Sequence, residues 1–160
     1  MATKTFTTFK LKDQLFGVEV LYVREINRQL DTTPVPHAPC FVRGLLNLRG
    51  QIVTILDLQK RLSEHNAEIT EQSCNLILKT ENELAPIRTR EKRPDLKTTS
   101  DHVGLLVDSI DEIICINEDD IAEPPVNVGD VEKKYLSGVT TLEGRLLGIL
   151  AVDKVLEMQR

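Results

Sequence analysis

Short apolar runs and alternation of apolar with polar residues dominate this chain, and both patterns are typical of β-strands. Only brief helices are expected, at 58–62 and 154–159. Residues 21–26 (LYVREI) fit either a helical turn or the approach to a strand that begins at Ile26. Strands are predicted at 5–11, 15–20, 26–30, 42–48, 51–56, 74–79, 103–107, 113–116, 135–141 and 145–150. The pattern therefore indicates an all-β protein built from barrels.

The chain repeats itself. FGVEVLYVREI (16–26) aligns with VGLLVDSIDEI (103–113), and FVRGLLNLRGQIVTIL (41–56) aligns with YLSGVTTLEGRLLGIL (135–150). The matched positions are glycines, which permit turns, and apolar residues, which fill a core. Two copies of a β-unit are expected, at about 15–62 and 103–156, with a cleft between them. That arrangement favours a binding module.

Turn and cap residues recur in both copies. The clearest hairpin joins 42–48 to 51–56 through Arg49-Gly50, where Gly50 supplies the positive φ that such a turn often needs. Asp57 follows the second strand and is expected to cap a short helix, since Asp accepts from the free first-turn N–H groups. Structural roles in turns are assigned to Gly17, Gly44, Gly50, Gly104, Gly138 and Gly144.

Residues 80–101 interrupt the compact pattern. The stretch contains APIRTREKRPDLKTTSD, with five basic residues between positions 86 and 97. We interpret it as a long mobile loop between two paired strands, because polar, proline-containing stretches of this length seldom pack. A solvated loop is favoured over a dedicated site for an anionic ligand.

The length, charge and composition of the chain limit the classes of function it can have. At 160 residues the chain is long enough for one compact body, and its net charge of −5 with 4% aromatic residues disfavours a nucleic-acid partner. The sequence has no run of 18 apolar residues, and its first residues, MATKTFTTFK, lack the apolar core of a signal peptide. A cytoplasmic protein without direct membrane insertion is expected.

Catalytic and metal-binding patterns are not found. Asp57 after an apolar strand is similar to the phospho-acceptor of a receiver domain, but the alternating strands and helices of that fold are missing. There is no G-x-S-x-G, P-loop or H-E-x-x-H sequence. No ligand or disulfide spacing links the cysteines and histidines: Cys40, Cys74, Cys115, His37, His65 and His102. No enzymatic activity, metal or cofactor is expected.

The two copies differ at the tip of the hairpin. Arg49 in LNLRG aligns with Glu143 in TTLEG, while Glu25 aligns with Glu112. Copy one can therefore form an Arg–Glu pair that copy two cannot. A weak surface pair is one interpretation. We favour a structural or interfacial pair, because Arg49 lies at a tight turn between two apolar strands and its planar guanidinium suits a carboxylate.

Taken together, these blocks resemble the CheW family of bacterial chemotaxis coupling proteins. The resemblance rests on FGVEVLYVREI, P-x-x-P-x-F-V-R-G-L-L-N-L-R-G-Q-I-V-x-I-L-D-L, VGLLVDSIDEI and YLSGVTTLEGRLLGILAVDKVL. It covers about residues 5–157, and its most specific part is G-x-x-N-L-R-G at 44–50. It implies a single domain of two pseudo-duplicated SH3-like five-stranded barrels around a shared apolar core.

The resemblance also implies a function and partners. The expected role is a non-enzymatic adaptor between the regulatory domain of a CheA-type histidine kinase and the helical cytoplasmic tip of a methyl-accepting chemoreceptor. Carried over residue by residue, the kinase contacts are Leu45, Leu46, Asn47, Arg49, Ile52 and Thr54. The receptor contacts carried over are Val23, Glu25, Arg49, Asn75, Leu76, Ile77, Leu78 and Val107.

Alternatives remain at this point. The long 80–101 segment departs from the short hairpin usual in the family, which leaves open a related chemosensory pathway, such as surface or pilus motility, with different receptors. A small β-barrel enzyme or nucleic-acid binder is the rival from another class. Partner identification would separate the first alternative, and turnover or oligonucleotide binding would revive the second.

Overall fold

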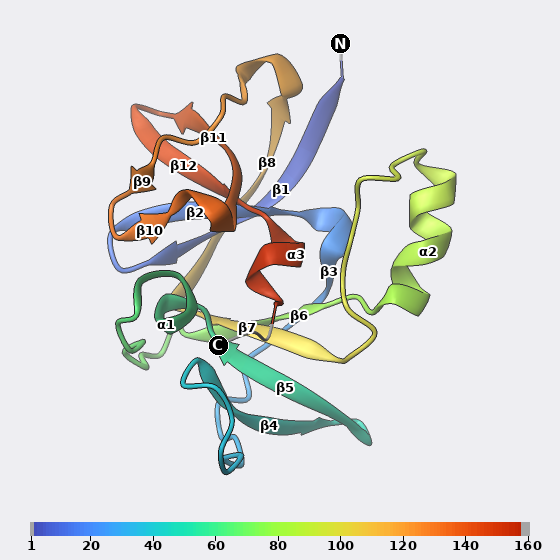
Figure 1. The fold of residues 1–160 in the computed structure, drawn as a ribbon, viewed down its shortest axis with the longest axis vertical. Helices are drawn as coiled ribbons and strands as arrows, with labels where there is room; N and C mark the ends of the chain where they lie inside the picture. Colours follow the sequence, from blue (N-terminus) through green and yellow to red (C-terminus); the bar gives the residue numbers. More distant parts are fainter. Residues whose placement is uncertain (1, 158–160) are drawn as a thin grey trace.

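A computed structural model describes residues 2–157 and contains two five-stranded sheets, a two-stranded ribbon and short helices (Figure 1). One sheet, called the first barrel, consists of β3 (Val23–Asn27), β4 (Val42–Leu48), β5 (Gln51–Asp57), β6 (Cys74–Leu78) and β7 (Val103–Val107). The other, called the second barrel, consists of β1 (Thr3–Leu11), β2 (Gln14–Glu19), β8 (Ser109–Asn117), β11 (Leu136–Leu142) and β12 (Arg145–Leu150). The predicted all-β class with paired five-stranded units is confirmed, although backbone pairing leaves each sheet open between its outermost strands.

The remaining elements are short. They are η1 (Val20–Tyr22), α1 (Leu58–Ser63), α2 (Glu81–Arg90), η2 (Glu118–Asp120), β9 (Asn127–Val128), β10 (Val131–Glu132), η3 (Lys133–Tyr135) and α3 (Val152–Val155). The ambiguous LYVREI stretch thus divides into a 3-10 turn and a strand, and that strand begins at Val23 rather than at Ile26. The closing helix begins before the predicted 154–159, and the end of that range lies outside the described residues.

The two sheets have the same strand order when the aligned segments are equated. The order is β11-β12-β2-β1-β8 in the second barrel and β4-β5-β7-β6-β3 in the first. The parallel pair in each sheet joins different copies: Gly17 of β2 lies opposite Ile149 of β12, and Gly104 of β7 lies opposite Ile55 of β5. Each sequence copy therefore gives its first strand to the sheet that contains the other copy's hairpin.

Local irregularities also recur at equivalent places. The β4–β5 pairing shifts register between Val42 and Gly44, and the β11–β12 pairing shifts between Leu136 and Gly138. Gly50 and Gly144 lie in turns as predicted, whereas Gly17, Gly44, Gly104 and Gly138 lie within strands and not in turns. At Gly44 and Gly138 a neighbouring segment comes too close for a side chain. A Cβ on Gly44 would lie 2.6 Å from the carbonyl oxygen of Thr33. A Cβ on Gly138 would lie 2.5 Å from the side-chain carbon Cγ2 of Ile121.

The apolar core has three parts. One small cluster lies within the first barrel and includes Val53 and Ile55, and another lies within the second barrel and includes Leu147 and Ile149. The largest cluster draws residues from both sheets and from all three α-helices. Burial of this common cluster fixes the two barrels against each other, since apolar area removed from water is the main stabilising term.

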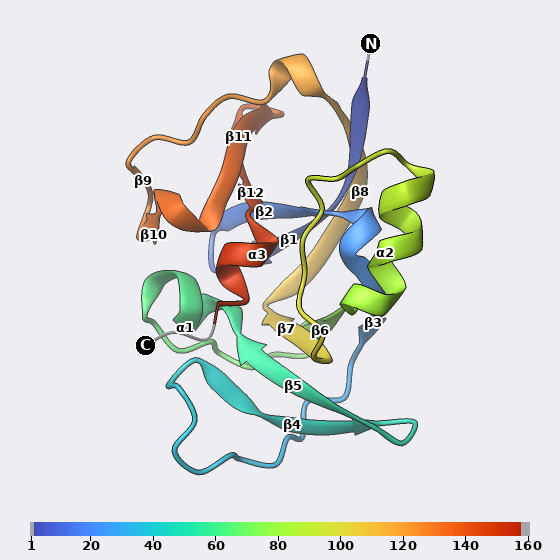
Figure 2. The same cartoon turned by 45° about the vertical axis from the view of Figure 1, so that its right-hand side comes forward.

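The prediction for residues 80–101 was wrong. Instead of a mobile loop, the segment forms α2 and an ordered return that lies against the body (Figure 2). Thr80 and Glu83 make a reciprocal capping box, and Leu84 and Leu96 are fully buried. Arg93 donates to both oxygens of Glu19 at 2.9 and 2.8 Å. Its polar composition concealed a T-x-x-E helix start and two buried leucines that anchor the segment.

Substituting Gly44 tests the close approach that shapes the first barrel. We expect Gly44→Ala to lower the free energy of unfolding by about 1–3 kcal/mol, because the new methyl group cannot avoid a backbone oxygen. Gly17→Ala is the matched control, since a Cβ there would meet its nearest atom at an ordinary 3.5 Å. Urea unfolding measures both; equal effects of the two substitutions would contradict this explanation.

Candidate functional site

An ion pair connects the two outermost strands of the first barrel. Arg49, in the turn between β4 and β5, donates through Nη2 to the carboxylate of Glu25 on β3. β3 and β4 lie at opposite edges of the sheet. Two backbone hydrogen bonds join Leu45 of β4 to Thr33, in the segment that follows β3, and the Arg49–Glu25 pair adds a side-chain link between the two edges. The Arg49 side chain is 66% exposed and that of Glu25 is 26% exposed, which puts the pair at the surface.

The turn holds Arg49 in place. Arg49 and Gly50 both have positive φ, at 52° and 85°, as in the two-residue turns that match strand twist. The Gly50 N–H donates to Oδ1 of Asn47 at 3.0 Å, which fixes the tip further. Asp57, at the other end of β5, accepts from the Lys60 N–H at 3.1 Å and so caps α1.

Glu25 interacts with a second cation. Nε of Arg24 donates to the same carboxylate at 3.3 Å. The hydrogen bond from Arg49 is the main cause that lowers the pKa of Glu25 below its ordinary value, and Arg24 adds to this effect. Glu25 is therefore ionised at neutral pH and is held between two arginines.

The second barrel has no equivalent pair. The aligned turn has the same backbone, with positive φ at Glu143 and Gly144 of 50° and 77°. The residues that align with Arg49 and Glu25 are Glu143 and Glu112, which are both acidic. The two barrels thus share a shape and differ in charge at the matching position.

The residues predicted to contact a kinase lie on the β4–β5 hairpin. Asn47, Arg49 and Ile52 are exposed, and Ile52 at 54% is unusually exposed for a large apolar side chain. Leu45 and Thr54 are partly buried, and Leu46 points into the barrel core. The hairpin tip therefore presents an apolar side chain next to an arginine.

The residues predicted to contact a receptor divide into two groups. Val23 is partly exposed, and with Glu25 and Arg49 it lies along one edge of the barrel. Five others are buried, because β6 and β7 lie inside the sheet and have packed side chains on both faces: Asn75, Leu76, Ile77, Leu78 and Val107. Any contact with a partner at this edge must be made by the exposed residues beside them.

Sequence reasoning missed three residues at this edge. Arg24 lies in the register shift of the β3–β6 pair, Ile26 is 43% exposed on the edge strand, and Glu83 of α2 lies 3.9 Å from Arg24. The sequence signal at Ile26 pointed the other way, since its alignment with the apolar Ile113 favoured a core position, whereas both side chains are exposed. Glu83 had none, because nothing in its segment indicated that the helix would pack near β3.

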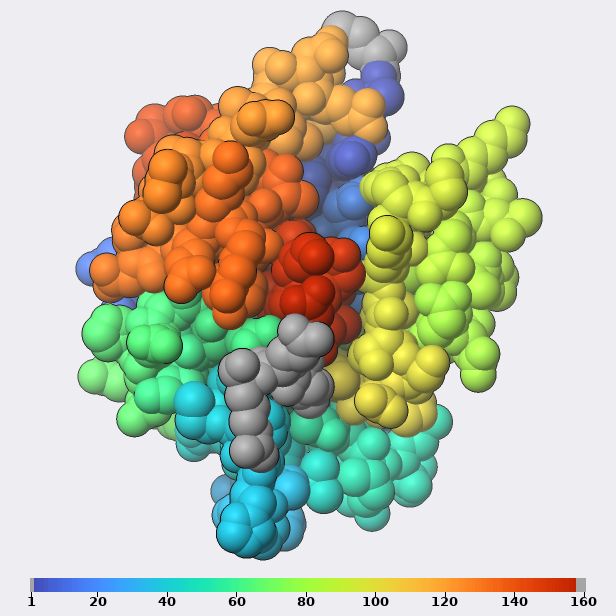
Figure 3. All heavy atoms as spheres, in the orientation of Figure 1, coloured from blue at the N-terminus to red at the C-terminus, as the bar shows by residue number. Residues whose placement is uncertain are grey.

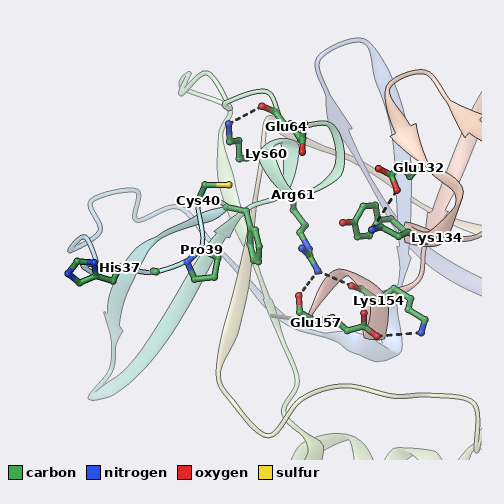
Figure 4. A pocket seen from close by; sticks show the side chains of 13 residues that line it. His37, Pro39, Cys40, Lys60, Arg61, Glu64, Glu132, Lys134, Lys154 and Glu157 are labelled. Carbon is green, nitrogen blue, oxygen red and sulfur yellow. Dashed lines mark hydrogen bonds and ion pairs between the residues drawn. The ribbon is translucent and has the colours of Figure 1, made fainter. Parts of the chain in front are cut away.

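A cavity lies elsewhere, between the two copies. It has a volume of about 750 Å³, and Arg61 of α1 points into it beside Lys154 and Glu157 (Figure 4). The Arg61 guanidinium lies 4.3 Å from the ring centre of Phe41 and 5.2 Å from that of Tyr135, which are aligned residues of the two copies. It also donates to backbone oxygens of the α3 region, including Val155 O at 3.1 Å. Arg61 thus serves as a clamp between copies and has few donors left for a ligand.

Within residues 2–157, no three His, Cys, Asp or Glu side chains are grouped so that they could hold a metal ion. The cysteines are unpaired, and burial raises the pKa of the Cys74 thiol, which makes it a poor nucleophile. No described helix is long and apolar enough to cross a bilayer. What the site offers is a surface for binding.

Comparison with known proteins agrees with this geometry. The profile of the CheW-like domain matches residues 5–160. This chain belongs to the CheW family. Chemotaxis protein CheW of Rhizobium meliloti is 33% identical over 147 residues, which cover 92% of this chain and 83% of the relative. Protein FrzA of Myxococcus xanthus is 27% identical, over 97% of this chain and 86% of its own length.

A solved structure supports the fold. The scaffolding protein TtCheW of Thermoanaerobacter tengcongensis superimposes with a TM-score of 0.79 over 98% of this chain and 90% of that one, at 24% identity. The predicted CheW resemblance is therefore confirmed. CheW proteins are scaffolds in chemotaxis signalling, and this chain has their fold over its described length.

The Glu25–Arg49 pair has a titration signature. We expect Arg49→Ala to raise the pKa of Glu25 toward its ordinary value, because the main hydrogen bond to the carboxylate is lost. NMR titration of the Glu25 carboxyl carbon measures this, with Arg90→Ala as a control, since Arg90 is 68% exposed and pairs with a different acid.

The same shift fixes the sign of the pH dependence. Since the folded-state pKa of Glu25 is lowered, the pair stabilises the fold above the pKa of the unfolded chain, and this contribution is lost as the pH falls through the lowered value. A Glu25 titration that stays at the same pH in Arg49→Ala would contradict the assignment of Arg49 as the main cause.

Proposed function

We propose that this CheW-family protein couples a chemoreceptor-type sensor to a CheA-type histidine kinase by binding both. The Glu25–Arg49 pair at the exposed edge of the first barrel carries the proposal. It lies between a protruding hairpin tip and the edge strand β3, and it has no equivalent in the second barrel. The role is that of an adaptor, with no chemical step.

The hairpin tip is the proposed kinase surface. Ile52 supplies an exposed apolar anchor, and Asn47 and Arg49 surround it with polar groups. An apolar centre with a polar rim that includes Arg is the usual composition of a protein–protein interface. Leu46 supports this surface from within the barrel. Its proposed partner is the regulatory domain of the kinase.

The edge at β3 is the proposed receptor surface. Val23 and Ile26 are apolar and partly exposed along an edge strand, and Glu25 lies between them. A helical receptor tip can lay an apolar face against such an edge, as helices do in apolar grooves. The buried strand β6 is hydrogen-bonded to β3 within the sheet and supports this edge.

Coupling follows from the position of Arg49, which belongs to both surfaces. A partner that forms a hydrogen bond or an ion pair with Arg49 or Glu25 alters the Glu25–Arg49 pair, and the other partner contacts this pair too. A receptor whose conformations differ in affinity for this edge can then shift the equilibrium of the kinase bound next to it. Differential binding of this kind needs no catalytic residue.

A related chemosensory pathway with other receptors is the second candidate. The similarity to Protein FrzA extends over 97% of the chain, and the ordered 80–101 segment lies beside the proposed receptor edge. Both candidates use the same surfaces. Co-purification of the partners from the native cell decides between them.

Substitutions at the tip test the two surfaces. We expect Arg49→Ala to weaken binding of both the kinase regulatory domain and the receptor tip by about tenfold or more, the level of a central interface residue. The melting temperature should change little, because exposed ion pairs contribute only about 0–1 kcal/mol. Ile52→Asp should weaken kinase binding and spare the receptor tip.

Isothermal titration calorimetry with each purified partner measures these effects. Val126→Asp, at a residue that is 77% exposed and far along the chain from the tip, is the control for adding a charge at an apolar surface position. Normal binding of both partners by Arg49→Ala would exclude this edge as the docking site.

A further inference from the structure

The 80–101 segment is anchored to the core that the two barrels share and to β2 of the second barrel. Leu84 and Leu96 are fully buried in the cluster that the two barrels share. Arg93 makes a two-point ion pair with Glu19, and both side chains are largely buried, at 19% and 12% exposed. α2 is therefore a fixed part of the surface and cannot swing aside without exposing apolar groups.

The segment lies beside the proposed receptor edge. The Lys97 N–H donates to the Tyr22 hydroxyl at 3.2 Å. Nζ of Lys79, the residue just before the segment, donates to Leu21 O at 2.9 Å. Hydrogen bonds near both ends of the segment therefore connect it to η1, which directly precedes β3. In Figures 1 and 2, α2 lies on the same side of the molecule as the β4–β5 tip. Figure 3 shows α2 standing out from the body as a ridge at that side.

A line of alternating charges joins this ridge to the hairpin tip. Arg49 pairs with Glu25, Glu25 accepts from Arg24 at 3.3 Å, and Nη1 of Arg24 lies 3.9 Å from Oε1 of Glu83 on α2. The line begins at an exposed arginine and ends at a carboxylate whose side chain is 37% exposed. A ligand that lies along β3 meets both ends.

The Glu83 carboxylate has one oxygen to spare. Its Oε1 accepts from the Thr80 N–H at 3.0 Å, contacts the Thr80 hydroxyl at 3.2 Å and faces Arg24. Among the described residues, the hydrogen bonds and the ion pair of the Glu83 carboxylate use this oxygen, while the Lys79 ammonium is a further cation that interacts with Glu83 electrostatically. Oε2 remains for a cationic group that approaches from outside, and a carboxylate accepts such a group through either oxygen.

From these contacts we infer that Glu83 is a specificity-determining residue of the receptor surface. It selects helical segments that carry a Lys or Arg where they pass α2. The inference rests on the proposed function, since it takes the β3 edge as the place where a receptor tip lies. It adds that α2 narrows the range of receptors that this protein accepts.

Glu83→Gln tests the inference without removing the helix start. Glutamine suits the third position of a capping box, so α2 should persist while the negative charge is lost. Glu91→Gln is the matched control, because it removes the same charge from the far end of α2. The probe is a recombinant cytoplasmic tip of a methyl-accepting receptor from the same genome, together with variants that change each of its Lys or Arg residues singly to Gln.

We expect Glu83→Gln to weaken binding of the tip by about two- to fivefold at low salt, the range for an exposed ion pair, and to leave kinase binding unchanged. One tip variant should show the same loss, and combining it with Glu83→Gln should add no further loss. The difference should disappear at about 1 M salt, where exposed charges are screened. Circular dichroism of both protein variants verifies that α2 is retained.

The contrary results are distinguishable. Equal tip binding by wild type, Glu83→Gln and Glu91→Gln would overturn the role of Glu83 and leave the proposed function intact. Additive losses in every combination with tip variants would do the same. Failure of the wild-type protein to bind any receptor tip would overturn both the inference and the receptor part of the proposed function.

Discussion

The parallel pairing of β2 with β12 and of β7 with β5 is the constraint on which this structure depends. Each pair inserts the first strand of one sequence copy into the sheet that holds the other copy's hairpin. Neither sheet is complete without both copies, and the largest apolar cluster lies between them. Arg61 adds a polar clamp at the same junction by contacting aligned aromatic residues of both copies. The relative position of the two barrels is therefore set by covalent order and core packing together.

Within this symmetric frame, the proposed binding edge lies where the copies differ. In the first barrel the Arg49–Glu25 ion pair links the β4–β5 turn to the edge strand β3, whereas the second barrel has two acidic residues at the aligned positions. The same backbone turn thus presents different chemistry at the two ends of the molecule. An adaptor must offer unlike surfaces to unlike partners. In the proposed function, a duplicated fold provides the surfaces, and Arg49 in place of Glu143 at the aligned turn is one of the differences between them.

Much of the fold could be predicted, because hairpins and buried strands leave local signals. Gly50 and the apolar strands on either side of it indicated the β4–β5 hairpin, and the aligned Glu25 and Arg49 indicated the ion pair. The exchange of strands could not be predicted, since alternation reveals which face of a strand is buried but not which strand lies beside it. The 80–101 segment was predicted to be a mobile loop because it is rich in charged residues. In the folded protein these charges form ion pairs, Arg93 with Glu19 and Arg88 with Glu81. The contact residues predicted on β6 were carried over from the family resemblance. Their burial could not be predicted, because it depends on which strands lie on either side of β6.

Coupling requires that both partners be bound at once, although Arg49 belongs to both proposed surfaces. Sedimentation velocity of the protein mixed with the kinase regulatory domain and the receptor tip tests this most directly. The account predicts one species that contains all three components and sediments faster than either pair. Two separate binary complexes, with each partner displacing the other as its concentration rises, would contradict it.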